Sequence, residues 1–299
     1  MRDKPRMMAK IILTLMLGLI AAGMLFPLVF TISNSFMSED EITAAYGILS
    51  PSREDEDSGG PSDSKADQFA VLKLIPDKVT LKQYGEVLFR KPQFLSMFWN
   101  AVVMTVPIIA GQTVVASLAA YALGKLHFAG RDKLFFLYLI TMLMPFQVTL
   151  VPNYIVADRL GLLGDFGAII WPGIFAAFGV FLLRQFMLQI PGAYVEAGKM
   201  DGAGHAQLFF RIVLPMCRPG LAALVILLFI DNWNMVEQPL IMLTEAIKQP
   251  LSVYLSRVRE GEQGIAFAAS ALYMAPMLFI FLYGENDLIA GIQLSGLKG

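Results

Sequence analysis

The sequence predicts an all-α integral membrane protein with six transmembrane helices and both termini in the cytoplasm. Three observations predict this class: the composition, the apolar segments and the distribution of positive charge. Of the 299 residues, 56% are hydrophobic and only 16% are charged, and the mean hydropathy is +0.61. Because soluble domains carry about 25% charged residues, this composition favours a bundle of membrane helices.

Six segments are long and apolar enough to cross a bilayer, which requires about 20 such residues. They span residues 11–35, 97–123, 134–156, 166–188, 220–243 and 264–284. The first segment is longer than the core of a signal peptide, and no small-x-small cleavage site follows it. We therefore expect it to be retained as a helix.

Positive charge sets the orientation of these segments. With the N-terminus inside, 12 Lys and Arg residues lie in cytoplasmic loops and tails, against four in the two short outer loops. The long segment 36–96 is left out of this comparison, because long loops translocate largely regardless of charge. Both termini and the loop 190–219 are therefore expected in the cytoplasm.

A single transmembrane domain is expected over residues 1–299, with an external insertion at 36–96. The middle of the insertion, residues 51–64, is charged and rich in Gly, Pro and Ser, so it is expected to be mobile. Order is expected to return at residues 74–77, ahead of Leu81.

Several function classes lack support in the sequence. No Walker-type Gly-x4-Gly-Lys-Ser/Thr sequence occurs, so the chain has no evident nucleotide site. The net charge of −1 comes without a basic patch for nucleic acid. Cys217 is the only cysteine and is expected to be a small buried thiol. The two histidines, His127 and His205, are far apart in the sequence and the one cysteine is distant, so no metal-ligand spacing is present and no metal site is expected.

The cytoplasmic loop 190–219, here called the coupling segment, carries the most informative spacing. It reads Glu196-Ala197-Gly198, three residues, Gly202, nine residues, then Ile212-Val213-Leu214-Pro215. Pro191 suits the first turn of a helix and Gly202 allows a sharp break, so two short helices are expected. Helical spacing groups Glu196, Lys199, Met200 and Ala203 on one face. Phe209, Ile212 and Val213 form an apolar stripe that packs on the membrane domain or on a partner.

This spacing resembles the "EAA" loop of ATP-binding-cassette (ABC) importer permeases, which docks onto a separate ATPase subunit. Further motifs agree in order and spacing between about residues 76 and 245. They are Phe98-Trp99-Asn100, Ala120-Tyr121-Ala122-Leu123, Phe128-Ala129-Gly130-Arg131, Met144-Pro145, Leu160-Gly161-Leu162, Asp201-Gly202-Ala203, Pro215-x3-Pro219 and Trp233-Asn234-x4-Pro239-Leu240. Together they resemble the maltose-type (carbohydrate) permeases of type I ABC importers.

The resemblance implies a fold, a location and a set of partners. It implies a multi-pass permease of a bacterial or archaeal cytoplasmic membrane that carries a sugar or sugar derivative by ATP-driven alternating access. The implied partners are an ABC ATPase dimer that binds ATP-Mg, a second permease in a hetero-dimer, and an extracytoplasmic solute-binding protein; this chain itself binds no cofactor. The implied ATPase-docking residues are Glu196, Ala197, Gly198, Asp201, Gly202, Ala203, Phe209 and Pro215.

Three positions depart from the pattern of these permeases. Gly198 replaces the second alanine of the triplet, at a cost in helix propensity of up to about 1 kcal/mol. Met235 follows the Trp-Asn pair, where an acidic residue is usual, and Glu237 comes two residues later. Residues 283–287 replace the usual aromatic-Gln-Arg end of the last helix.

The fifth apolar segment contains polar residues that would be costly against lipid and that tend to line cavities. Asp231, Asn234 and Gln238 recur at helical spacing, with Trp233 and Glu237 between them. An aromatic plane beside amides and carboxylates suits a sugar, so these five residues are candidates for the translocation pathway. The alternative is a structural ridge satisfied by neighbouring helices. Asn100, Gln112 and Asn153 are secondary candidates or helix-to-helix hydrogen-bond donors.

Two other function classes, a secondary carrier and an intramembrane enzyme, would need features that the sequence offers only in part or not at all. An ATP-independent secondary carrier would need a midplane carboxylate, which Asp231 or Glu237 could supply, and inverted repeats, which are not visible. An intramembrane enzyme would need paired His/Asp/Glu or Ser/Lys groups, which the sequence does not offer.

Overall fold

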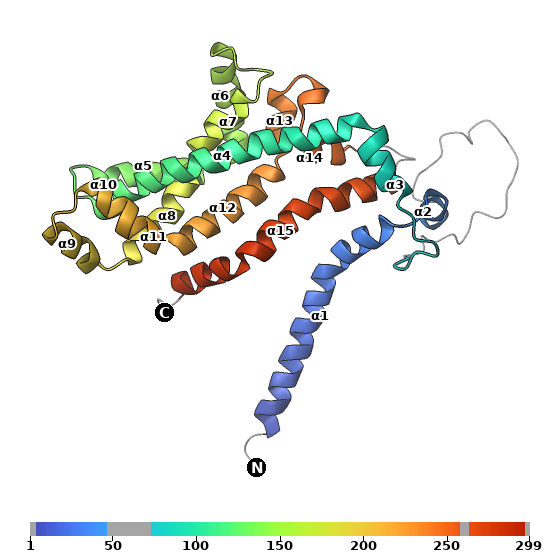
Figure 1. Cartoon of the computed structure of the whole chain (residues 1–299), viewed down its shortest axis with the longest axis horizontal. Helices are drawn as coiled ribbons and strands as arrows, with labels where there is room; N and C mark the ends of the chain where they lie inside the picture. Colours follow the sequence, from blue (N-terminus) through green and yellow to red (C-terminus); the bar gives the residue numbers. More distant parts are fainter. Residues whose placement is uncertain (1–3, 47–72, 258–262, 297–299) are drawn as a thin grey trace, which may run out of the picture. The chain divides into compact units, whose positions relative to one another are not determined.

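The computed structural model describes residues 4–46, 73–257 and 263–296, and every regular element in these ranges is a helix (Figure 1). The predicted all-α class is confirmed. Contacts divide the chain into two compact units: unit 1 holds Met1–Leu95 and Arg257–Met274, and unit 2 holds Ser96–Ser256 and Ala275–Gly299. The prediction of mobility for residues 51–64 lies outside the described residues. The single permease domain over 1–299 stays a prediction.

Unit 1 begins with α1 (Lys4–Asn34), followed by α2 (Glu39–Tyr46), the short α3 (Lys82–Gly85) and the π-helical turn η2 (Glu86–Arg90). Its small core joins α2 to the first turns of α15 (Gln263–Gly296), where Phe267 packs edge-on against Phe30. No residue of the most apolar stretch of α1 is buried against the described chain. Lipid or another subunit must therefore cover it.

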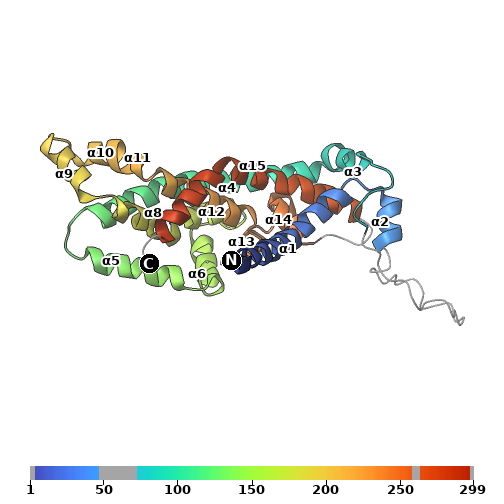
Figure 2. The same cartoon turned by 90° about the horizontal axis from the view of Figure 1, so that it is seen from below.

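Unit 2 contains the remaining helices. They are α4 (Pro92–Lys125, which begins in unit 1), α5 (Arg131–Leu143), α6 (Phe146–Arg159), α7 (Gly167–Ile174), α8 (Ala177–Gln189), α9 (Gly192–Met200), α10 (His205–Leu208), η3 (Phe209–Val213), α11 (Leu214–Met216), α12 (Arg218–Trp233), α13 (Glu237–Met242), η4 (Ala246–Lys248), α14 (Leu251–Leu255) and the second half of α15. Helices α5 and α12 both pack on α8, and α13 packs on α7. Figure 2 shows α9, α10 and α11 together at one end of this unit.

Among the described residues, four helices are long and apolar enough to cross a membrane, or up to six if each bent pair counts as one span. The predicted third span, 134–156, is interrupted because α5 ends at Leu143 and α6 begins at Phe146, with a bend of 100°. Pro145 has no N–H and pushes Met144 into an extended conformation, with ψ at 127°. The predicted fifth span, 220–243, is likewise interrupted between Trp233 and Glu237.

Side-chain donors bond the backbone carbonyls exposed by the helix breaks of unit 2. Within a bilayer such carbonyls have no water to bond, so each needs a partner from the protein. The bonds run from Asn100 to the carbonyls of Ile247 (2.7 Å) and Gln249 (3.2 Å), from Gln112 to Ala176 (3.2 Å), from Gln249 to Leu243 (3.1 Å) and from Ser252 to Met235 (2.5 Å). These side chains hold the irregular backbone between the helices of unit 2 in place.

The coupling segment forms the two short helices that the sequence predicts. Helix α9 ends at Met200 and α10 begins at His205, and the reversal between them depends on Gly202, whose φ is +80°. A residue with a Cβ is strained in this left-handed region, at a cost of about 1–2 kcal/mol. Gly204, two residues later, has a φ of −73°, which any residue adopts.

We predict that Gly202→Ala destabilises the turn by about 1 kcal/mol, whereas Gly204→Ala has little effect. The two glycines form a matched pair, because an added Cβ meets no atom within 4 Å at either position. Hydrogen exchange of the α9 and α10 amides in the purified protein measures the difference. Equal exchange in the two variants would contradict the role of the left-handed turn.

An ion-pair cluster of unit 1 lies beside α2. Lys73 lies between Glu41, at 2.8 Å, and Asp77, while the Asp77 backbone N–H donates to Glu41 Oε1 at 2.8 Å. These contacts stabilise the Glu41 carboxylate and hold its pKa below its ordinary value of 4.5.

The stabilising contribution of Glu41 is predicted to depend on pH. It is complete above pH 4.5, the ordinary pKa, and is lost as the pH falls from there through the lowered pKa of the folded state. Hydrogen exchange of the α2 amides, corrected for intrinsic rates, should accelerate over that acidic range in the native chain. In Glu41→Gln the α2 amides should already be less protected at neutral pH and should show no such transition; a transition of the same size in this variant would contradict the assignment.

Candidate functional site

Unit 2 contains a polar cavity of about 980 Å³ where α12 ends and α13 begins. Its walls come from α4, α6, α7, α8, α12 and α13, which meet at the break between Trp233 and Glu237. The polar lining residues are Gln112, Thr149, Asn153, Asp231, Asn232, Asn234, Glu237 and Gln238. The apolar ones include Phe146, Pro172, Ala176, Phe178, Leu227, Ile230 and Met235. A cavity of this size and polarity accommodates a small polar molecule.

Most residues predicted for the pathway share this cavity. Asp231, Asn234, Glu237 and Gln238 line it from one side, and Asn153 lines it from α6. Thr149 and Asn232 also line the cavity but were not among the predicted pathway residues. Thr149 lies one helical turn before Asn153, and Asn232 lies within the polar run of α12, so both positions carried a signal in the sequence.

Trp233 and Asn100 lie elsewhere. Trp233 is buried to 2% exposure, stacked on Phe229 at 5.1 Å and edge-on to Phe98 at 5.5 Å. Its ring therefore anchors the end of α12 to the bundle and does not face the cavity. The side-chain amide of Asn100 donates to the carbonyls of Ile247 and Gln249, just before α14. This is the helix-to-helix hydrogen bonding that the sequence left open as an alternative.

The donors of the cavity wall are partly committed to the backbone. Thr149 Oγ1 donates to the Phe146 carbonyl at 2.9 Å, and the side-chain amides of Asn232 and Asn234 each donate to the carbonyl four residues earlier, at 2.8 Å. The two carboxylates, Asp231 and Glu237, are exposed to the cavity and have no ion-pair partner among the described residues. The end of α12 is therefore rich in hydrogen-bond acceptors.

The coupling segment presents one face outward and one face to the bundle. Glu196, Ala197, Asp201, Gly202 and Pro215 are exposed. Met200 is 89% exposed, which is unusual for a large apolar side chain. Such a face is suited to a protein partner, because exposed apolar residues rimmed by polar ones mark interaction sites.

The apolar stripe packs on the membrane bundle, which is one of the two alternatives that the sequence left open. Phe209 is 4% exposed and lies 5.2 Å from the ring of Tyr121 on α4, and Val213 is fully buried in the same core. Phe209 therefore lies on the inner side of the segment, and Ala203 packs partly against the same core.

Polar contacts fix the same end of the bundle. Lys125 Nζ donates to the carbonyl of Ile190, at the end of α8, at 2.6 Å. Arg184 Nε donates to the Leu123 carbonyl at 3.1 Å, and its guanidinium lies 3.8 Å from the centre of the Phe135 ring. The carbonyls at the ends of α4 and α8 thus gain cationic partners, which suit the negative end of a helix.

The glycine at position 198 has a packing reason. A Cβ there would lie 2.6 Å from Leu208 Cδ2 and 2.8 Å from Ile212 Cδ1, so the absent side chain lets α9 lie against α10 and η3. Both clashing atoms are the far ends of flexible side chains, so alanine is accommodated by small shifts. Close packing offsets the lost helix propensity.

Cys217 is buried between α11 and α12, as expected. Burial raises the pKa of its thiol to about 11, so the thiol stays protonated at neutral pH and is a poor nucleophile.

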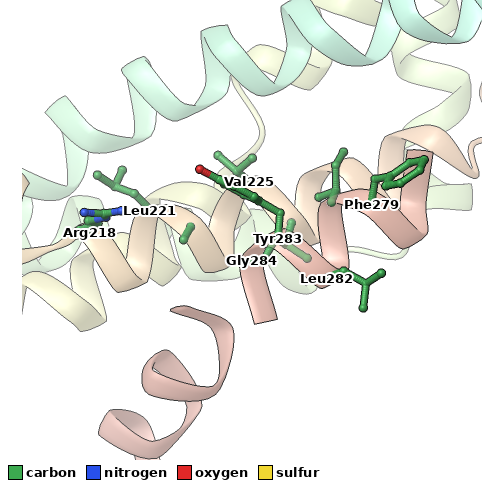
Figure 3. A pocket seen from close by; sticks show the side chains of 10 residues that line it. Arg218, Leu221, Val225, Phe279, Leu282, Tyr283 and Gly284 are labelled. Atoms are coloured by element: carbon green, nitrogen blue, oxygen red, sulfur yellow. The ribbon is translucent and has the colours of Figure 1, made fainter. Parts of the chain in front are cut away.

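A second hollow of unit 2 differs in character. It is a groove of about 800 Å³ between α12 and α15, lined by Leu221, Val225, Phe279 and Leu282 among other apolar residues (Figure 3). Its charged lining residue is Arg218. A groove with so few polar groups does not fit a hydrated solute, so the polar cavity is the candidate binding site.

Two similar proteins are named as permeases of transport systems. The arabinooligosaccharides transport system permease protein AraQ of Halalkalibacterium halodurans is 29% identical over 227 residues, which cover 75% of this chain and 81% of the relative. The sn-glycerol-3-phosphate transport system permease protein UgpE of Brucella abortus is 27% identical over 232 residues, covering 74% and 82%.

A solved structure shares the fold. It is a chain from the crystal structure of a bacterial ABC transporter involved in the import of the acidic polysaccharide alginate, with a TM-score of 0.77, 23% identity, and coverage of 96% of this chain and 99% of that chain. The type I permease fold predicted from the sequence is confirmed.

The family model for binding-protein-dependent transport system inner membrane components matches residues 85–285, which include the polar cavity and the whole coupling segment. The chain therefore belongs to this family of multi-pass membrane permeases, the transport subunits of binding-protein-dependent importers.

Proposed function

We propose that this chain forms one half of a passage for a sugar or sugar derivative and that a separate ATPase drives it through the coupling segment. The polar cavity at the end of α12 carries the proposal, because it gathers amides and carboxylates in the interior of a membrane bundle. Relatives named for arabinooligosaccharides and glycerol phosphate support a polyhydroxylated solute. The secondary-carrier alternative has no support in the family match.

The proposed partners follow from the family and from the exposed face of the coupling segment. An ATPase dimer binds ATP-Mg and seats α9 through Glu196, Ala197, Asp201 and Gly202, while Gly198, Ala203 and Phe209 support that face from behind. A second permease completes a hetero-dimer in the bacterial or archaeal cytoplasmic membrane, and a solute-binding protein delivers solute on the outer side. This chain itself binds no cofactor.

The lever role predicts that Glu196→Lys abolishes ATP-driven uptake while the chain still inserts, because the reversed charge faces the motor. Uptake in cells and co-purification of the ATPase measure the effect. Asp158→Lys, an exposed charge reversal on α6, is the matched control and should retain uptake. Full uptake in Glu196→Lys would refute the lever role.

The passage role predicts that filling the cavity blocks transport without dismantling the complex. Ala176 lines the cavity, so Ala176→Trp places an indole inside it, whereas Phe175→Trp adds an indole one residue away at a position that does not line it. Uptake should fall to background in the first variant and persist in the second, with both variants retaining the ATPase on purification. Normal uptake in Ala176→Trp would exclude this cavity as the passage.

A further inference from the structure

The charge of the polar cavity bears on the class of solute that the proposed passage carries. Among the described residues that line it there are two carboxylates, Asp231 and Glu237, and no Lys, Arg or His. We propose that the cavity selects an uncharged polyhydroxylated solute and rejects phosphate- and carboxylate-bearing ones. This inference rests on the proposed function, since it assigns the solute class of the same passage.

The two carboxylates, Asp231 and Glu237, give the cavity its charge. Neither has an ion-pair partner among the described residues, so their charge is not neutralised locally. Charges that face a hollow with low-dielectric walls act over longer distances than charges in bulk water, because fewer mobile ions and dipoles screen them. An anionic solute entering this hollow would meet repulsion and no compensating cation.

Helix geometry adds to the same field. Helix α12 has 16 residues and ends at Trp233, so its negative end points to the break that lines the cavity. One amide hydrogen of Asn232 and one of Asn234 are bonded to helix carbonyls, as is the hydroxyl hydrogen of Thr149. The carboxylates and amide oxygens at the end of α12 remain as acceptors for a ligand. Hydroxyl groups donate to acceptors, whereas phosphates and carboxylates require donors.

The inference separates this chain from some of its relatives by chemistry. Two of the similar proteins are named for acidic cargo, one for glycerol phosphate and one for the acidic polysaccharide alginate, and one is named for arabinooligosaccharides. The cavity charge fits the last kind of solute, a neutral sugar oligomer.

The test measures the potential of the cavity with charged thiol reagents. Thr149→Cys in a Cys217→Ser background places this chain's single thiol on the cavity wall, and the assembled transporter is probed in membrane vesicles. The probes are a neutral, a cationic and an anionic thiosulfonate of similar size, applied at low salt with and without ATP. The cation-to-anion rate ratio should exceed that of free 2-mercaptoethanol by about tenfold or more.

Neutralising variants identify the source of the field. Asp231→Asn with Glu237→Gln should bring the rate ratio close to that of the free thiol, whereas Asp158→Asn, which removes a carboxylate of α6 outside the cavity, should leave it high. A ratio equal to that of the free thiol in the unaltered cavity, or a ratio that survives neutralisation, overturns the inference. Uptake of tri-galacturonate by the unaltered transporter also overturns it, and uptake of arabinotriose alone supports it.

The neutral reagent separates this inference from the proposed function. Its rate should change with ATP if the cavity is the passage of an ATP-driven transporter. A nucleotide-dependent neutral rate with no charge preference refutes the selectivity and leaves the proposed function in place. A neutral rate indifferent to nucleotide refutes the passage, and with it the assignment of a solute class.

Discussion

Every backbone carbonyl that leaves a helix inside a bilayer must find a donor within the protein, and unit 2 depends on a few side chains that meet this demand. Asn100, Gln112, Gln249 and Ser252 each donate to a carbonyl beside a helix break. With these bonds in place, α12 ends early, the chain turns at residues 234–236, and a cavity with polar walls opens in an apolar bundle.

Helix α12 joins this cavity to the coupling segment. It starts at Arg218, directly after α11, and reaches Asp231 at the cavity, and its 16 residues span about 24 Å. Its first turns lie tightly against α8, since a Cβ on Gly220 would be 2.6 Å from Phe186 Cγ. A displacement of the coupling segment therefore moves a stiff, closely packed rod whose other end carries the polar groups. Alternating access requires such a connection between the two sites.

The sequence anticipated the helices, the turn at Gly202 and most of the cavity, because each depends on local chemistry. Left-handed backbone selects glycine, and polar residues in an apolar segment indicate a cavity. The sequence could not decide whether Trp233 faces the cavity or whether Phe209 packs on the bundle or on a partner. A large aromatic residue in a motif serves packing or recognition equally well, and only the contacts with Phe229 and Tyr121 distinguish the two roles.

Tertiary packing also explains features that the sequence left as departures. Gly198 lowers the helix propensity of α9, but its missing side chain lets α9 pack closely against Leu208 and Ile212. The bend of 100° at residues 144–145 is larger than the Met144-Pro145 pair predicts, because proline more often only kinks a helix. Thr149 of α6 and Phe178 of α8 were missed because they come from segments that are distant in sequence from the polar run of α12, although Asn153 of α6 was predicted.

ATP-driven transport by this chain requires that the outer face of α9 bind the ATPase. A photo-crosslinking amino acid in place of Met200, whose side chain is 89% exposed, tests this contact directly in the intact membrane complex. Mass spectrometry should identify a covalent adduct between this chain and an ATPase subunit. Adducts only with lipid or with this chain itself, in a complex that still transports, would contradict the account.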